Sequence, residues 1–128
     1  MAYDVLIVDD SQTMRKVIRK SVIISGFDLG ACWEAANGAE ALGIVRSQKI
    51  DVILSDFNMP GMNGLEMAKE LQKDEKYRQI PILFISAQEN PEVTKEGKML
   101  GIRGHIQKPF RPEEIRDLLQ RTLEKPNA

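Results

Sequence analysis

The apolar residues of this chain alternate between short continuous runs and stretches with helical spacing. Continuous apolar runs of strand length occupy residues 5–8, 52–55 and 82–85. Between them, apolar residues recur every three or four positions, which is the spacing of one helix face. Strands that are apolar on both sides and joined by helix-length segments are typical of a parallel sheet covered on both faces. The sequence therefore predicts an α/β fold with five strands and five helices.

Turn and cap residues place the remaining elements. Two weaker strands are expected near residues 31–35 and at 105–107. Ser11 is expected to cap the first helix and Pro112 to begin the last. The five expected helices lie at residues 11–26, around 41–45, at 65–71, at 92–100 and at 112–123. Apolar spacing places Val17 on the inner face of the first helix and Leu65 on that of the third, and Asn37 with Gly38 is expected to form a turn. The fourth is the weakest, because Gly97 interrupts it.

Length and charge predict a single domain spanning residues 1–128. Lys and Arg total 18 against 19 for Asp and Glu, and no basic run appears, so neither nucleic acid nor an anionic membrane is an expected partner. The apolar runs are far shorter than the roughly 20 residues of a membrane-spanning helix, and the first residues do not resemble a signal peptide. The single cysteine, Cys32, excludes an intrachain disulfide. These features predict a cytoplasmic protein.

Three acidic residues follow directly after two of the apolar runs. Asp9 and Asp10 come after residues 5–8, and Asp56 comes after residues 52–55. In an open α/β sheet the ligand crevice lies at the carboxyl ends of the strands, so neighbouring strands would bring these carboxylates into one small volume. Two carboxylates about 4 Å apart repel by roughly 4 kcal/mol at an effective dielectric of about 20. A divalent cation is the simplest neutralising partner.

Four motifs occur in order between about residue 4 and residue 123. They are Val8-Asp9-Asp10-Ser11, Asp56 with Met59-Pro60-Gly61-Met62-Asn63-Gly64, Ser86-Ala87, and Lys108-Pro109-Phe110. Together they resemble the response-regulator receiver domain of two-component signalling, in its stand-alone chemotaxis-regulator form. The resemblance implies a flavodoxin-like (βα)5 fold, which is a doubly wound parallel sheet of five strands in the order 2-1-3-4-5 with helices on both faces.

The resemblance assigns Asp56 as the phosphoacceptor. A carboxylate can attack phosphorus and form an acyl phosphate, and in this family the phosphoryl group comes from a histidine kinase or a phosphotransfer protein. The implied cofactor is Mg²⁺, held by Asp9, Asp10, Asp56 and the backbone carbonyl of Asn58. The preference of Mg²⁺ for oxygen ligands agrees with this set.

Lys108, Ser86 and His105 are the remaining expected site residues. Lys108 supplies a cation that can pair with the carboxylate at rest and with the phosphoryl group afterwards, and in receivers its bond to the following proline is cis. Ser86 offers a hydroxyl to a phosphoryl oxygen and is expected to be a switch residue together with residue 105. Receivers usually have Tyr or Phe three residues before the lysine, where the ring moves on activation, whereas this chain has His105. His105 is expected either to be a tolerated polar residue or to act as a switch whose charge depends on pH.

Three other functions compete with this interpretation. A Mg²⁺-dependent aspartyl phosphatase of the haloacid type would carry Asp-x-Asp after its first strand, whereas this chain reads Asp9-Asp10-Ser11-Gln12. A flavodoxin-like cofactor binder needs a Ser/Thr/Gly loop that cradles phosphate, and two aspartates at that point would repel an anion. A pseudo-receiver would be an interaction module that is never phosphorylated. The complete set of three aspartates and one lysine argues against the pseudo-receiver.

The expected protein is not an enzyme in the usual sense, although with Mg²⁺ it would catalyse its own phosphorylation and autodephosphorylation. Because the last helix ends near the end of the sequence, output through a protein-protein contact is expected, unless the domain belongs to a longer chain. The resemblance places that contact on the fourth helix, fifth strand and fifth helix, around residues 95–116. A monomer or weak dimer is expected. The sequence identifies neither the kinase nor the downstream target.

Overall fold

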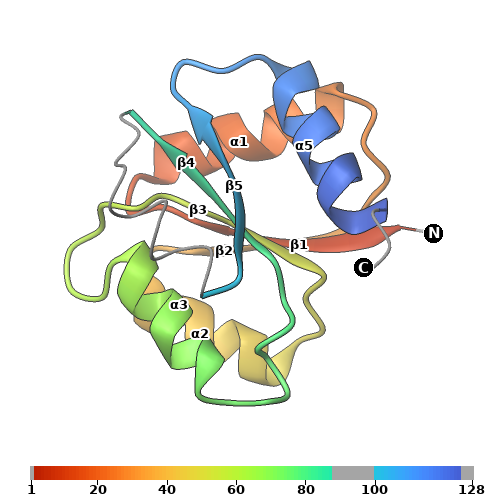
Figure 1. The fold of residues 1–128 in the computed structure, drawn as a ribbon. Coiled ribbons are helices and arrows are strands. Elements are labelled where there is room, and N and C mark those ends of the chain that lie inside the picture. Colours follow the sequence, from red (N-terminus) through yellow and green to blue (C-terminus); the bar gives the residue numbers. More distant parts are fainter. Residues whose placement is uncertain (1, 88–99, 125–128) are drawn as a thin grey trace.

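Strands and helices alternate along residues 3–86, as the apolar pattern predicts, and a final strand and helix occupy residues 102–124 (Figure 1). The computed structural model describes residues 2–87 and 100–124. Its elements are β1 (Tyr3–Val8), α1 (Gln12–Ile24), β2 (Leu29–Ala35), α2 (Gly38–Ser47), β3 (Val52–Ser55), α3 (Gly64–Gln72), β4 (Ile82–Ser86), β5 (Ile102–Gln107) and α5 (Pro112–Glu124). The helix expected at 92–100 lies, except for its last residue, outside the described residues.

All neighbouring strands in the sheet are parallel, in the order β2-β1-β3-β4-β5. This order confirms the predicted doubly wound topology and places β1 and β3 side by side. The central strands β1, β3 and β4 are the three continuous apolar runs. The edge strands β2 and β5 begin earlier than predicted, at Leu29 and Ile102. Their first residues were not predicted because each edge strand mixes polar, glycine and apolar residues and is only partly buried.

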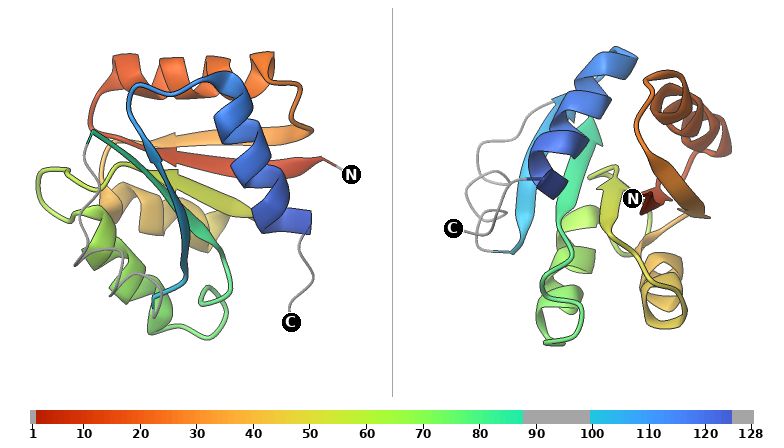
Figure 2. Two further views of the ribbon diagram at one scale, coloured as in Figure 1. Left: turned by 45° about the horizontal axis from the view of Figure 1, so that its top comes forward. Right: turned by 90° about the vertical axis from the view of Figure 1, so that its right-hand side faces the viewer.

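Successive side chains of each central strand point to opposite faces of the sheet and form two apolar layers. On one face, strand residues such as Leu6, Ile53 and Phe84 pack with α2 and α3. On the other face, residues such as Ile7, Leu54 and Ile85 pack with α1 and α5. Figure 2 shows the two helix pairs on either side of the sheet. No helix in the described part of the chain is long and apolar enough to cross a bilayer.

Polar caps fix where three helices begin. The Ser11 side chain accepts a hydrogen bond from the backbone N–H of Met14, which confirms the predicted start of α1. Asn37, expected only as a turn residue, caps α2. Asn63 and Glu66 form a reciprocal capping box at α3. Since each cap follows a loop at the carboxyl end of a strand, the caps also define where those loops end.

Two helices bury a face that differs slightly from the predicted one. In α1, Ile18 and Val22 are buried, but Val17 is 44% exposed, because the helix contacts the sheet through a narrow stripe of residues four apart. In α3, Met67 is fully buried, whereas Leu65, which the spacing placed on the inner face, is half-buried. Apolar spacing therefore located the helices but did not fix their rotation about the helix axis.

Candidate functional site

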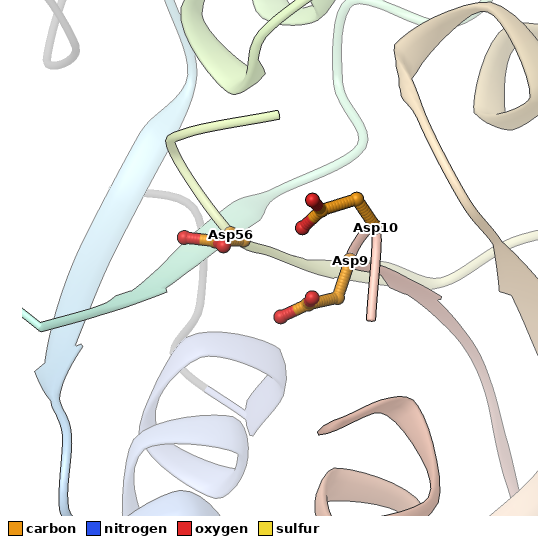
Figure 3. Close-up of side chains that lie close together, drawn as sticks. All are labelled: Asp9, Asp10 and Asp56. Carbon is orange, nitrogen blue, oxygen red and sulfur yellow. The ribbon is translucent and has the colours of Figure 1, made fainter. Parts of the chain in front are cut away.

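The three predicted acidic residues meet at the carboxyl end of the sheet. In the register of β1 and β3, Val8 pairs with Ser55, so Asp9 and Asp56 leave the sheet next to one another. The backbone N–H of Asp56 donates to the carbonyl of Val8 at 2.8 Å. One carboxylate oxygen from each of Asp9, Asp10 and Asp56 lies within 4.8 Å of the others. Figure 3 shows these carboxyl groups gathered where the two strands end.

Asp9 is the buried member of this cluster, with 2% of its surface exposed. Its backbone N–H donates to the carbonyl of Ala35, and its Oδ1 accepts the backbone N–H of Ser11. Its Oδ2 is buried and accepts no hydrogen bond from any described residue, although Lys108 Nζ lies 3.6 Å away. A buried anionic oxygen without a donor is costly unless a cation satisfies it. This oxygen and the all-carboxylate donor set therefore fit a hard divalent cation such as Mg²⁺.

Opposing effects act on the pKa of the Asp56 carboxyl group. Burial raises the pKa of the Asp56 carboxyl above its ordinary value, because the charged form loses hydration. The positive charge of Lys108 lowers that pKa, and the negative charge of Asp9 raises it further. Hydrogen bonds from the backbone N–H groups of Asn58 and Phe57 lower it. The net effect is a raised pKa, so Asp56 is a partly desolvated carboxylate that a neighbouring cation would stabilise.

Lys108 follows β5 and reaches back to the acidic cluster. Its Nζ lies 3.6 Å from Asp9 Oδ2 and 3.9 Å from Asp56 Oδ2, and its side chain is 21% exposed. Its backbone N–H donates to the carbonyl of Ser86 at the end of β4. The bond to Pro109 is cis, as the resemblance implied. Lys108 is thus a shared cation between two of the three carboxylates.

Ser86 and His105, the two residues expected to act as a switch, contact each other. Ser86 ends β4 and is 5% exposed. His105 lies in the neighbouring strand β5, opposite Phe84. Ser86 Oγ is 2.7 Å from His105 Nε2. Which atom donates depends on the imidazole tautomer.

The loop after Asp56 is fixed by close backbone packing. The N–H of Gly64 donates to the carbonyl of Phe57 at 3.0 Å. A Cβ on Gly64 would stand 2.8 Å from the Asp56 carbonyl oxygen and 2.9 Å from the Phe84 ring, so this turn requires glycine. Asn58 is exposed within the loop. The predicted role of its carbonyl as a metal ligand stays a prediction.

Sequence reasoning did not identify Arg15 and Glu34 as part of this region. Arg15 Nη1 donates to the carbonyl oxygen of Asp9 at 2.7 Å, and Arg15 Nε donates to Glu34 Oε1 at 3.0 Å. An arginine in an amphipathic helix is ordinarily exposed, so its identity gave no signal. Glu34, a charged residue near the end of a strand that neighbours β1, was the available clue.

Comparisons with known proteins agree with this geometry. The profile of the response regulator receiver domain matches residues 5–120. The chemotaxis protein CheY of Pseudomonas aeruginosa is 32% identical over 124 residues, covering 97% of this chain and 98% of the relative. Chemotaxis protein CheY-3 of Vibrio cholerae is 33% identical over 121 residues, covering 94% of this chain and 92% of the relative.

Solved structures give the same result. The structure of chemotaxis protein CheY4 of Vibrio cholerae superimposes with a TM-score of 0.86 at 37% identity, covering 96% of this chain and 100% of that one. The family profile spans far more than half of the chain, and the strand order and the acidic cluster agree with it. The chain therefore belongs to the response-regulator receiver family.

Proposed function

We propose that Asp56 is the residue that accepts the phosphoryl group in this receiver. The observation that carries the proposal is the meeting of three carboxylates and Lys108 at the ends of β1, β3 and β5. Asp56 is accessible enough for a donor to reach it, since its side chain is 14% exposed, whereas the Asp9 side chain is 3% exposed. Of the two aspartates that pair with Lys108, Asp56 is therefore the better nucleophile.

In the proposed transfer, a carboxylate oxygen of Asp56 forms a bond to phosphorus while the donor's bond to phosphorus breaks. With a phosphohistidine donor, the bonding electron pair stays on the imidazole nitrogen, which then takes up a proton. The product is an acyl phosphate. Lys108 pairs with Asp56 beforehand and offsets the charge of the phosphoryl group afterwards. The same groups would serve autophosphorylation from small phosphodonors and autodephosphorylation by water.

Asp9, Asp10, Asp56 and the Asn58 carbonyl would hold Mg²⁺ in this proposal. The metal would supply charge neutralisation for the phosphoryl oxygens. The buried Asp9 Oδ2, which has no hydrogen-bond donor among the described residues, supports this assignment. Asp10 is exposed and lies on the open side of the cluster, where it can bind the ion directly or through water.

Residues 1–128 would form a single receiver domain that signals by contact with other proteins. The two relatives described above are named chemotaxis proteins, which supports a chemotaxis component as target. Membership of the receiver family supports a histidine kinase or a phosphotransfer protein as donor. The Ser86–His105 pair would link the phosphoryl site to an output surface that includes β5 and α5. A Mg²⁺-dependent aspartyl phosphatase and an unphosphorylated pseudo-receiver remain the alternative functions.

Phosphotransfer profiling tests the proposal and identifies the donor. Purified histidine kinases carrying labelled phosphate are mixed with the receiver and Mg²⁺. We expect one kinase to lose its label rapidly to the wild-type chain and to keep it with Asp56→Asn. Equal transfer to the Asn variant would assign the phosphoacceptor to another residue. Repeated hydrolysis of a small phosphate monoester by the wild-type chain, in the absence of any kinase, would favour the phosphatase.

A further inference from the structure

Arg15 contacts the backbone of the acidic cluster rather than its carboxylates. Arg15 lies in the first turns of α1, and its side chain is only 15% exposed. Its Nη1 donates to the main-chain carbonyl oxygen of Asp9 at 2.7 Å. A short bond from a charged donor is among the stronger hydrogen bonds in proteins. The carbonyl of Asp9 belongs to the peptide group that joins Asp9 to Asp10, so Arg15 fixes the orientation of that peptide.

The Asp9–Asp10 peptide largely determines where the Asp10 carboxylate lies, because few other contacts fix the Asp10 side chain. Asp10 is exposed, and within residues 2–87 and 100–124 its side chain makes no hydrogen bond and no ion pair. Asp9 is held through its backbone N–H and its Oδ1. The position of the Asp10 carboxylate relative to Asp9 and Asp56 therefore depends on the backbone between the two aspartates.

Glu34 holds the guanidinium in place and offsets its charge. Arg15 Nε donates to Glu34 Oε1 at 3.0 Å, and Glu34 lies one residue before Ala35, whose carbonyl accepts the N–H of Asp9. Arg19 approaches the other carboxylate oxygen of Glu34 only at 3.7 Å and is 51% exposed, so this second pair is weak. A neutralised guanidinium can stand beside a cation site without repelling the cation strongly.

We propose that Arg15 is a positioning residue for the metal site, acting through the Asp9–Asp10 peptide and held by Glu34. The inference rests on the proposed function, because it assumes that Asp9 and Asp10 bind the cation. Groups that orient metal ligands from outside the ligand set typically affect affinity by about 10- to 100-fold when removed. Only arginine can serve here, since two nitrogens of one planar group must reach two acceptors at fixed angles.

A purely electrostatic role for Arg15 predicts the opposite result. If the guanidinium acted only as a nearby positive charge, its removal would strengthen Mg²⁺ binding. If it positions the peptide, its removal weakens binding despite the lost repulsion. The sign of the change in Mg²⁺ affinity therefore separates the two roles.

The test is calorimetric titration of the metal-free protein with Mg²⁺ at neutral pH, performed well below each variant's melting temperature. We expect Arg15→Met to weaken Mg²⁺ binding about tenfold. Arg15→Lys keeps the positive charge but has no planar guanidinium to reach both acceptors. It should therefore weaken Mg²⁺ binding almost as much as Arg15→Met does. Glu34→Gln keeps an acceptor for Arg15 Nε but leaves the guanidinium charge unbalanced, so it should weaken Mg²⁺ binding less than Arg15→Met does. The matched control is Arg19→Met, which removes the other partner of Glu34 and should leave Mg²⁺ affinity unchanged.

Unchanged or tighter Mg²⁺ binding in Arg15→Met would overturn the inference, as would full affinity in Arg15→Lys. Asp10→Ala, titrated alongside, separates this failure from failure of the proposed site. If Asp10→Ala loses Mg²⁺ binding while Arg15→Met keeps it, only the role of Arg15 is wrong. If wild type itself binds no Mg²⁺, both the metal assignment and the role of Arg15 are wrong.

Discussion

Ser86 Oγ lies 2.7 Å from His105 Nε2, across the neighbouring strands β4 and β5. The Ser86 hydroxyl, which the family resemblance directs toward a phosphoryl oxygen, therefore already has an imidazole partner in this structure. Engagement of the phosphoryl group by Ser86 would replace this contact if Oγ donates to the imidazole, and would polarise it if Nε2–H donates to Oγ. We therefore expect His105 to report the state of Asp56 on the β5 side of the sheet.

Proton NMR of the imidazole can follow this contact, because His105 is the only histidine of the chain. We expect its ring resonances to shift when beryllofluoride and Mg²⁺ are added, since the hydrogen bond to Ser86 changes. The Asp56→Asn variant, treated identically, should show no comparable shift. Ring resonances that stay in place in wild type, under conditions where beryllofluoride binding is verified by fluorine NMR, would return His105 to the role of a tolerated polar residue.

Asp56→Asn should stabilise the metal-free protein at neutral pH by a few degrees in melting temperature. The pKa of Asp56 is raised in the folded state, mainly by burial, so the folded state binds this proton more tightly than the unfolded chain does. Wild-type stability therefore falls as pH rises from the ordinary value of 3.8 through the raised value. The Asn variant lacks this loss. The measurement is the melting temperature of both proteins in the presence of a chelator, from acidic to neutral pH. The difference between the two melting temperatures should shrink toward acidic pH, and a difference that stays constant would contradict this explanation.

Lys108→Met should destabilise the metal-free protein at neutral pH by about 2 kcal/mol, a value between those of exposed and buried ion pairs. The reason is that Asp9 and Asp56 lose their shared cation. Added Mg²⁺ should recover more stability in this variant than in wild type, because the metal replaces the missing charge. Denaturant unfolding measures both effects. Lys20→Met, at an exposed lysine of α1, is the control and should change neither.

Gly64→Ala and Gly43→Ala should change stability in opposite directions. A Cβ at Gly64 would meet the Asp56 carbonyl and the Phe84 ring, at a cost of about 1–3 kcal/mol. A Cβ at Gly43, inside α2, meets nothing within 4 Å, so alanine should gain up to about 1 kcal/mol from helix propensity. Denaturant unfolding of both variants is the measurement. Stabilisation by Gly64→Ala would mean that the turn after Asp56 is looser than described.

The sequence predicted those parts of the fold that depend on local pattern. Strands β1, β3 and β4 were found because residues buried on both faces give continuous apolar runs. The edge strands were shortened in the prediction, since partial exposure breaks that pattern. The strand order came from the family resemblance, because pairing between distant segments leaves little local trace. The rotation of α1, which exposes Val17, also depends on tertiary packing.

The candidate site divides in the same way. Asp9, Asp10 and Asp56 could be predicted because they stand where apolar strands end. Lys108 and Ser86 needed the resemblance, since a lysine or serine after a strand is common in any fold. The contacts of Arg15 with Glu34 and of Ser86 with His105 each span 19 positions. The first contact requires α1 to lie beside β2, and the second requires β4 and β5 to be neighbours, so both could be seen only in the structure.

Intact-mass spectrometry after treatment with acetyl phosphate and Mg²⁺ tests the central claim most directly. Transfer breaks the bond between acetate and phosphorus and forms one acyl phosphate on Asp56. We predict that wild type gains a single base-labile phosphoryl group, that omission of Mg²⁺ prevents the gain, and that Asp56→Asn gains none. A wild type that stays unmodified, or an Asn variant modified to the same extent, would contradict the assignment of Asp56 as the phosphoacceptor.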